Sequence, residues 1–447
     1  MVNKNRLVIF IVMAIVVVVA IGIFLYIRSS EWTVSITSNP TGAGVYINDE
    51  YKGVTPLKVT LYPKANYSVY HLKLKKEGYE DVARGIQKTD VKDNNIAIEL
   101  ARNGKGAVIW KFNLGFEVVD SSPVASDGKV YIGSYDHYLY CLDVNDGDVV
   151  WKYKTGHVIR STPAVSDGKV YISSFDSYLY CLNADNGNFI WKSKIAIYKS
   201  SDWNKHIGIS DSSPAISNGK VYIGSNDSYI YCLNADNGNM LWKHKTGGEI
   251  YSTPAVSDGK VYISSFDSYL YCLNADNGSV IWKYKAEGMG YSSPSVSNGK
   301  VYIGSRNPGF YCFNANNGNI IWKYNIGIDY SSPAVYDGKV YIGLSGPALY
   351  NFNADNGSIF WKYDRERGIP PDSFFSPVAS NGKIYIGSDD YCIYCFNADN
   401  GNFIWKYKVG GPIRTTPAVS DKKVYVSSEI YSGSSYTSYL YCLSADN

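Results

Sequence analysis

Hydrophobic and polar positions follow three different patterns along the chain. Residues 7–27 form a stretch of 21 residues without a charge, and residues 32–100 contain short alternating runs such as TVSIT, GVYIN and LKVTL. From residue 104 onward one pattern recurs with a period of about 40 residues. Alternation with a period of two predicts half-buried strands, and the Gly, Pro, Asn and Asp residues between the runs predict tight turns. The pattern therefore predicts an all-β protein preceded by one apolar segment.

Each repeat unit contains enough alternating runs for four short strands. One unit reads SSPAVSDGKVYIGS, then YLYCLNADNGN, and then an apolar pair followed by Trp-Lys-Tyr. Asp-Gly or Asn-Gly occupies most of the hairpin turns. Four strands in a period of about 40 residues are typical of a β-propeller blade. The repeat prolines are Pro123, Pro163, Pro214, Pro254, Pro294, Pro333, Pro377 and Pro417, and the repeat tryptophans are Trp110, Trp151, Trp191, Trp242, Trp282, Trp322, Trp361 and Trp405.

The phase of the repeat predicts how the ring closes. Trp110 belongs to an outer strand that lacks its three inner strands, and the unit that begins at Pro417 stops before its own outer strand. Residues 106–112 are therefore expected to pair with the strand that ends in Tyr441-Cys442-Leu443, which leaves no open sheet edge. Seven complete units and one composite unit predict a closed eight-bladed propeller over residues 104–447.

The apolar stretch 7–27 is long enough to cross a hydrocarbon core of about 30 Å as a helix. Lys4 and Arg6 precede it and Arg28 follows it, which favours a cytoplasmic tail at residues 1–6 and a body on the extracytoplasmic side of the cell membrane. The alternative is a cleaved signal peptide, whose apolar region usually has about 7–15 residues and ends at a small-x-small site. This run is longer and ends in YIR, so we expect a single-pass transmembrane anchor.

Composition argues against a nucleic-acid partner. The chain has 43 basic and 40 acidic residues, with a net charge of +3. No run of Lys and Arg would follow a phosphate backbone. The 42 tyrosines, 10 tryptophans and 41 glycines instead agree with many short strands joined by tight turns.

Residues 32–101 carry three turn motifs in a characteristic order. Pro40-Thr41-Gly42-Ala43 comes first, Gly53-Val54-Thr55-Pro56 follows, and Lys76-Glu77-Gly78-Tyr79 is the third. This order resembles the PEGA family of small surface β-sandwich modules. The resemblance implies a β-sandwich without catalytic residues, such as a spacer that holds the larger domain away from the membrane.

The run from Cys181 to Trp191 resembles the tryptophan-docking motif of the pyrroloquinoline-quinone-type propellers. That motif has a small residue, a polar residue two positions later, and a Gly followed four positions later by Trp. It recurs in seven units, while one unit has Asn351 in place of the cysteine. The resemblance implies that each Trp packs on the neighbouring blade. The family includes quinone dehydrogenases as well as cofactor-free scaffolds, so the fold alone does not decide the function.

The quinone dehydrogenases of that family typically use adjacent cysteines, a calcium ion held by Glu, Asn or Asp, and a catalytic Asp. This sequence contains no Cys-Cys pair and none of the long insertions that build the cofactor chamber. The chain therefore resembles the propeller scaffold of outer-membrane β-barrel assembly more than the dehydrogenases. We expect no cofactor and no catalytic residues, with a quinone-dependent dehydrogenase as the alternative.

The cysteines and histidines predict no metal or redox site. Equivalent positions in neighbouring blades should lie about 10 Å apart, beyond the reach of a disulfide, so these cysteines are expected to be buried apolar residues beside the docking tryptophans. Cys392 and Cys395 form a Cys-x-x-Cys run, but alternate strand positions point to opposite faces. Asp143 to Asp148 superficially resembles a calcium loop but lacks the distal Glu, which predicts a hairpin turn. The seven cysteines at one repeat position are Cys141, Cys181, Cys232, Cys272, Cys312, Cys395 and Cys442.

Four N-glycosylation sequons occur, at Asn66, Asn226, Asn277 and Asn356. Such sequons matter only if the organism glycosylates its surface proteins.

The candidate binding site is the mouth of the axial channel. Insertions at 194–210, 364–373 and 429–438 fall in links between blades or in second turns, which lie on one face of an up-and-down propeller. The position three before each repeat proline opens the innermost strand and varies while its neighbours stay nearly constant. Its eight residues are Asp120, Arg160, Asp211, Tyr251, Tyr291, Tyr330, Phe374 and Arg414. Residues that would complete the rim are Trp203, His206, Arg365, Arg367 and Phe375.

Carboxylates, guanidiniums and aromatic rings at one mouth can hydrogen-bond and stack with a protein or a glycan. The alternative is that the charged members only neutralise one another around a water-filled opening. The sequence thus predicts a membrane-anchored cell-surface scaffold that binds a surface protein or glycan. A purely structural component of a surface layer is a third possibility.

Overall fold

The computed structural model describes residues 32–39, 41–61, 70–76, 82–86, 95–99, 107–115, 120–195, 212–307, 309–328, 331–344, 348–364, 374–431, 433 and 436–445. The chain divides into two compact units, Met1–Asn103 and Gly104–Asn447. All regular elements in the described ranges are β-strands, and none of these residues belongs to a helix that could span a membrane. The anchor expected at residues 7–27 lies outside the described residues.

The first unit consists of two small sheets that share one apolar core. A three-stranded sheet has the order β4 (Leu57–Leu61), β1 (Trp32–Asn39), β7 (Asn95–Glu99). A four-stranded sheet has the order β3 (Glu50–Val54), β2 (Gly44–Ile47), β5 (Tyr70–Lys75), β6 (Val82–Ile86). Trp32 and Val34 of β1 pack in the same buried cluster as Val45 of β2 and Leu74 of β5. Alternate residues of both sheets therefore face a common interior.

The second unit contains eight four-stranded antiparallel sheets in the described residues. Seven of them follow the chain from an innermost strand of three residues to an outer strand. The first four are β9–β12 (Val124–Ser126, Lys129–Gly133, Tyr138–Asp143, Val149–Lys154), β13–β16 (Ala164–Ser166, Lys169–Ser174, Tyr178–Asn183, Phe189–Lys194), β17–β20 (Ala215–Ser217, Lys220–Gly224, Tyr229–Asn234, Met240–Lys245) and β21–β24 (Ala255–Ser257, Lys260–Ser264, Tyr269–Asn274, Val280–Lys285). The next three are β25–β28 (Ser295–Ser297, Lys300–Ser305, Gly309–Asn314, Ile320–Tyr324), β29–β32 (Ala334–Tyr336, Lys339–Gly343, Ala348–Asn353, Ile359–Asp364) and β33–β36 (Val378–Ser380, Lys383–Gly387, Cys392–Asn397, Phe403–Lys408).

The eighth sheet is shared between the two ends of the repeat region. Its order is β37 (Ala418–Ser420), β38 (Lys423–Tyr431), β39 (Tyr436–Ser444), β8 (Val108–Gly115). Cys442 lies opposite Trp110, and Leu443 lies opposite Val108. The amide of Ser444 donates to the carbonyl of Ala107 at 2.8 Å, as within an ordinary hairpin of the repeat. The pairing expected between the first and last strands is therefore present.

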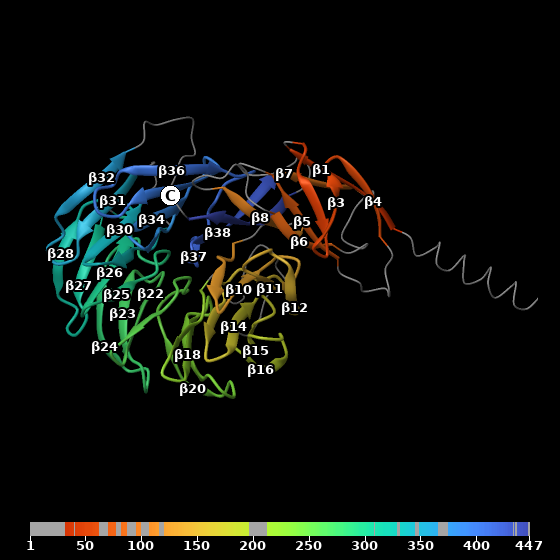
Figure 1. Ribbon diagram of the computed structural model, residues 1–447. Helices are drawn as coiled ribbons and strands as arrows, with labels where there is room; N and C mark the ends of the chain where they lie inside the picture. The colour runs from red at the N-terminus through yellow and green to blue at the C-terminus, as the bar shows by residue number, and fades with distance from the viewer. Residues whose placement is uncertain are drawn as a thin grey trace, which may run out of the picture. The chain divides into compact units, whose positions relative to one another are not determined.

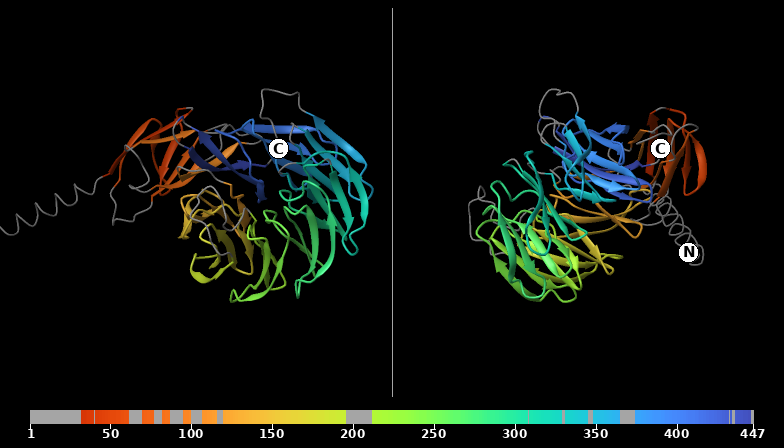
Figure 2. Two further views of the ribbon diagram at one scale, coloured as in Figure 1. Left: turned by 180° about the vertical axis from the view of Figure 1, so that it is seen from behind. Right: turned by 90° about the vertical axis from the view of Figure 1, so that its left-hand side faces the viewer.

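The sheets of the second unit follow one another around a common centre, where the innermost strands lie (Figures 1 and 2). Each innermost strand contacts the next, from β9 to β37, and β37 contacts β9. Hydrogen bonds link these strands through the hydroxyl residue before the repeat proline. The amide of Ser122 donates to the Thr162 hydroxyl at 3.3 Å, and the amide of Thr416 donates to the Ser122 hydroxyl at 3.0 Å. The arrangement is propeller-like.

The repeat tryptophans join each sheet to the next. Trp151 Nε1 donates to the carbonyl of Ala184 in the following sheet at 3.1 Å. Its ring lies on Gly187, where a Cβ atom would come within 2.7 Å of the indole, so only glycine fits there. The tryptophans with an equivalent bond are Trp110, Trp151, Trp191, Trp242, Trp282, Trp322 and Trp361.

The cysteines lie in this packed interior, as expected from the repeat. All eight are buried and carry free thiols. Cys181 pairs across the strands with Trp191, and burial raises the pKa of its thiol to about 12. Such a thiol stays protonated at neutral pH and is a poor nucleophile or metal ligand. The Asp143 run is a hairpin turn, since the Gly147 amide donates to the Asp143 carbonyl at 3.0 Å.

Candidate functional site: the mouth of the propeller

Two sets of side chains lie at the same end of the strands in each sheet of the second unit. One set precedes the innermost strand, and the other follows the second strand. Val124 of β9 lies opposite Tyr131 of β10 in an antiparallel pair, so Asp120 and Tyr135 lie near the same end of the sheet. We call the end of the sheets where these two sets of residues lie the mouth.

The first group of mouth residues surrounds Arg160. Tyr135 donates its hydroxyl hydrogen to Asp120 at 2.5 Å, and Arg160 Nε lies 3.4 Å from the same carboxylate oxygen. The Arg160 guanidinium also lies over the rings of Tyr135 and Phe175, at 5.1 and 4.8 Å from their centroids. A guanidinium between two aromatic rings is held in place by cation–π attraction as well as by charge. This side chain is thus ordered by three neighbours.

Two imidazole rings extend this group along the surface. His137 stacks on His157 with centroids 5.4 Å apart, and His157 lies 6.3 Å from the Phe175 ring. The sequence did not predict that these two histidines would meet. The described residues contain no group of three or more His, Cys, Asp or Glu placed to hold a metal ion.

The second group of mouth residues is aromatic. Phe266 packs edge-to-face against Tyr251 and Tyr291, with centroids 4.9 and 4.6 Å apart, and is still 36% exposed. The Arg306 guanidinium lies 4.4 Å from the Tyr291 centroid, and Tyr251 donates to Glu249 at 2.6 Å. Large half-exposed rings flanked by charges form a surface that can bury considerable area on contact.

A glycine makes room for this aromatic group. Four positions before the repeat proline, other sheets have a buried isoleucine, such as Ile159 or Ile250. The sheet β25–β28 has Gly290 at this position, with φ at 144°. A Cβ atom on Gly290 would come within 2.6 Å of the Phe266 ring. Met289 fills the core beside it instead, at 3% exposure. The change of repeat pattern therefore lets Phe266 lie across the backbone of the next sheet.

The third group joins the end of the repeat region to the sheet before it. Arg414 Nε donates to Asp389 at 3.0 Å. Both predicted arginines in the described residues are thus paired with carboxylates, Arg160 with a predicted partner and Arg414 with one that the sequence did not identify. The insertion at 429–438 lengthens the β38–β39 hairpin, where the exposed rings of Tyr431 and Tyr436 lie 4.9 Å apart.

Phe374 does not line the mouth, so the prediction was wrong for this residue. Its side chain is 2% exposed and packs on Tyr394 at 5.2 Å. Its amide donates to the Leu344 carbonyl, the bond that Ile159 makes to Ser134 in an earlier sheet. The Ser331 hydroxyl donates to the Phe375 carbonyl at 3.1 Å, as the Ser121 hydroxyl does to the Ser161 carbonyl, so the half-buried Phe375 takes the place of the serine that follows the mouth residue in other repeats.

One predicted glycosylation site is buried, and several other predicted residues lie outside the described ranges. Asn226 is 6% exposed, which contradicts its use as a glycosylation acceptor, because the acceptor amide must reach a large enzyme. Asn277 and Asn356 lie exposed in hairpin turns. The predicted residues outside the described ranges are Asn66, Asp211, Trp203, His206, Tyr330, Arg365 and Arg367.

The prediction missed the residues of the second turns. The second turns hold the aromatic and charged side chains that contact the predicted residues before the repeat prolines. Like those residues, they differ from one repeat to the next. Comparing units at this position, just after the second strand, would have found them. The mouth residues that the sequence did not identify are Tyr135, Phe175, Phe266, Arg306 and Asp389.

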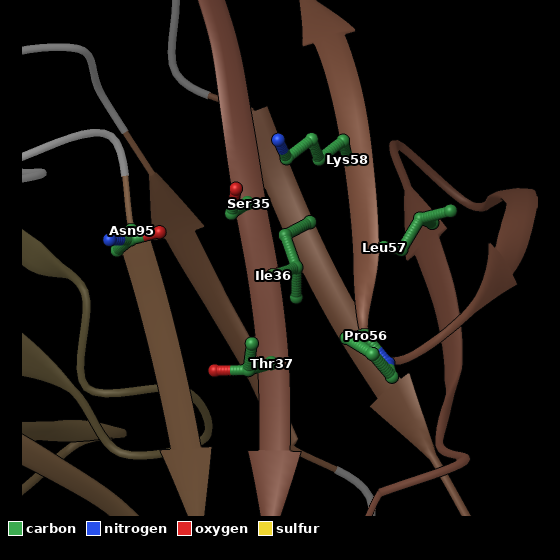
Figure 3. A pocket seen from close by; sticks show the side chains of 7 residues that line it. All are labelled: Ser35, Ile36, Thr37, Pro56, Leu57, Lys58 and Asn95. Carbon is green, nitrogen blue, oxygen red and sulfur yellow. The ribbon is translucent and has the colours of Figure 1, made fainter.

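A hollow of about 340 Å³ lies elsewhere, on the three-stranded sheet of the first unit (Figure 3). It is open to solvent and lined by residues of β1, of β7 and around the start of β4. Among its lining residues only Lys58 carries a charge, so the hollow offers no paired groups for acid–base chemistry. Its lining residues are Ser35, Ile36, Thr37, Pro56, Leu57, Lys58 and Asn95.

Comparison with protein families decides the family of the repeat region. The family model described as outer membrane protein assembly factor BamB matches residues 95–197, 175–293, 267–373 and 369–439. These overlapping matches cover most of the chain. The chain belongs to the BamB family. A PEGA domain model matches residues 31–103, so both resemblances noted from the motifs are confirmed.

Solved structures similar to the chain include BamB itself and quinone-dependent enzymes. BamB from Moraxella catarrhalis is 18% identical with a TM-score of 0.60, covering 75% of this chain and 98% of that chain. A quinohemoprotein alcohol dehydrogenase from Pseudomonas putida HK5 is 15% identical with a TM-score of 0.61, covering 77% of each chain. The quinohemoprotein alcohol dehydrogenase from Comamonas testosteroni is 14% identical with a TM-score of 0.62, covering 76% of each.

These identities are low, so the likeness shows the propeller fold alone. A search of curated proteins gave no match. Membership of the BamB family agrees with a scaffold type of propeller. The mouth described above belongs to this chain's own residues, and its chemistry has to be argued from them.

Proposed function

We propose that this BamB-family chain is a membrane-anchored, non-enzymatic scaffold that binds a protein through the mouth of a closed eight-bladed propeller. The eight sheets, the β39–β8 pair and the contact between β37 and β9 support the closed ring. A ring without open edges presents a rigid face on which loops and turns can be held in fixed positions.

The mixed aromatic and arginine surface of the mouth is the observation that carries the proposal. Tyr and Arg are enriched where protein interfaces concentrate their binding energy. Phe266, Tyr251 and Tyr291 form one half-exposed aromatic group, and Arg160 is fixed between two rings. Side chains that are already ordered lose little entropy on binding. A small-molecule site is usually an enclosed pocket, whereas these groups lie spread over several sheets.

The membrane anchor supports a location at the cell surface. The uncharged stretch 7–27 with its preceding Lys4 and Arg6 favours an extracytoplasmic body. The PEGA module lies between this stretch and the propeller in the sequence. BamB, by its description, is an outer membrane protein assembly factor, and we extend to this chain only the role of a protein-binding scaffold.

Crosslinking in intact cells followed by purification of the chain tests the proposal. We expect one dominant protein partner, and we expect Arg160→Ala combined with Tyr291→Ala to reduce its recovery at least about tenfold, as for the loss of interface hot spots. The matched control is Met240→Ala combined with Leu241→Ala, which truncates two exposed side chains on an outer strand, 50% and 47% exposed.

Unchanged recovery with the mouth variant, at unchanged melting temperature, would contradict the proposal. A regular lattice of the chain with itself would instead identify a structural surface-layer component. Recovery of a glycan without protein would show that the mouth binds carbohydrate. Oxidation of an alcohol or sugar with added quinone and calcium would identify a dehydrogenase.

A further inference from the structure

The eight outer strands of the propeller share one pattern of exposed residues. Each strand begins with an apolar pair, continues with the docking Trp, and then carries a lysine, often with a second lysine two positions later. In β16 this reads Phe189-Ile190-Trp191-Lys192-Ser193-Lys194, with the tryptophan buried and both lysines exposed. The lysines of the outer strands, which we call the lysine girdle, are Lys111, Lys152, Lys154, Lys192, Lys194, Lys243, Lys245, Lys283, Lys285, Lys323, Lys362, Lys406 and Lys408.

Acidic residues are nearly excluded from the same strands. Among the eight outer strands as bounded above, Asp364 is the one carboxylate, and it pairs with Lys362 at 2.7 Å. Other carboxylates engage lysines of the second strands, as in the pair of Lys129 with Asp185 at 2.8 Å. The net charge of +3 therefore conceals an uneven distribution of charge along the chain. The eight outer strands together carry thirteen positive charges and one negative charge.

The girdle lysines are held in similar positions from sheet to sheet. Lys192 Nζ lies 4.6 Å from the centroid of Tyr178, and Lys283 Nζ lies 4.5 Å from that of Tyr269. Equivalent contacts occur at Lys152 and Lys243, at 4.9 and 4.7 Å. Cation–π attraction thus holds these four ammonium groups against the lateral surface of their sheets, where the lysines remain exposed.

The nearby carboxylates are occupied by other donors. Asp176 accepts hydrogen bonds from the Tyr180 hydroxyl at 2.5 Å and from the amides of Tyr178 and Gly156 at 3.1 and 2.8 Å. The same three bonds recur around Asp267, and the two bonds from tyrosine residues recur around Asp136. The lysines of four neighbouring outer strands, β12, β16, β20 and β24, are all exposed to solvent, where a ligand can reach them.

We infer that the lysine girdle binds a linear anionic polysaccharide. The eight sets of lysines follow the circumference, so a flexible chain can contact successive sheets, whereas a flat membrane surface would contact few of them. The girdle contains no arginine, the residue that best matches phosphate through two parallel hydrogen bonds. The tyrosine rings beneath the lysines are covered by ammonium groups, so they do not offer the open stacking platforms that single-stranded nucleic acid requires. Repeated carboxylates on a sugar chain need only spaced positive charges.

This inference is independent of the proposed function, because the girdle and the mouth share no residue. Either surface can be altered without changing the other. A propeller that holds a polysaccharide at its circumference and a protein at its mouth would connect the two at the cell surface.

Binding of the full chain to immobilised polygalacturonate tests the inference. In detergent solution at low salt we expect retention, and we expect the apparent affinity to fall at least about tenfold as NaCl is raised from 0.05 to 0.5 M, since salt screens exposed charges. No retention at low salt would overturn the inference. Equal or tighter binding to double-stranded DNA or to vesicles with anionic lipids, at the same salt, would also overturn it.

Variants in neighbouring sheets locate the contact. Replacing Lys152, Lys154, Lys192 and Lys194 with glutamine should weaken retention at least about fivefold, and a second set at Lys243, Lys245, Lys283 and Lys285 should act alike. The matched control replaces the same lysines with arginine, which keeps the charge and should keep retention. Because all these side chains are exposed, the melting temperature should be unchanged. Glutamine variants that bind as well as the original chain would place the contact elsewhere.

Discussion

At the scale of residues, the docking unit of tryptophan, alanine and glycine explains how neighbouring sheets are held together. Trp191 is 7% exposed, donates to the Ala235 carbonyl at 3.1 Å, and covers Gly238 of the next sheet. The motif could be recognised in the sequence because the spacing from Gly to Trp is constant. The need for glycine became clear only from the structure, in which a Cβ atom on Gly238 would come within 2.5 Å of the indole.

Trp191→Ala should destabilise the propeller by about 3–5 kcal/mol, because it removes a large buried ring and one hydrogen bond. Urea unfolding of the purified chain measures this loss. The matched control is Ile190→Ala, whose side chain is 39% exposed and whose loss should cost well under half as much. Equal effects of the two substitutions would show that the tryptophan does not join the sheets.

At the scale of elements, the most informative strand is β8, which completes a sheet that begins some 300 residues later in the chain. The phase of the repeat predicted this pairing, since one unit lacked inner strands and another lacked an outer strand. Counting from the repeat proline failed where an insertion precedes it, so Phe374 was assigned to the mouth although its side chain fills the core. A pattern read by position cannot detect a shift that depends on which side chain fills the core.

Deletion of residues 104–113 should expose the edge of β39 and cause aggregation or loss of expression. Five residue pairs between β39 and β8 would be lost, including the one between Cys442 and Trp110. The control deletes residues 1–103, which form the other compact unit, and should leave a propeller that melts cooperatively. A soluble and cooperative product from the shorter deletion would contradict the closure of the ring through β8.

At the scale of the whole molecule, repetition gathers residues that are far apart in the sequence into continuous surfaces. The mouth could be predicted in part, because the variable position before each proline is visible in the sequence. Its aromatic centre was missed, because Phe266 depends on Gly290 of the next repeat to lie where it does. The lysine girdle was missed because no run of lysines marks it, although the fold places thirteen of them on equivalent strands.

The most direct test of the proposed protein binding at the mouth uses one photoreactive phenylalanine analogue at two positions of the full chain. Position 266 lies at the mouth and position 189 on an outer strand, and both phenylalanines are partly exposed, at 36% and 49%. Irradiation of intact cells should give a discrete crosslinked protein from position 266 and none from position 189. A protein crosslinked from position 189, with none from position 266, would contradict binding at the mouth.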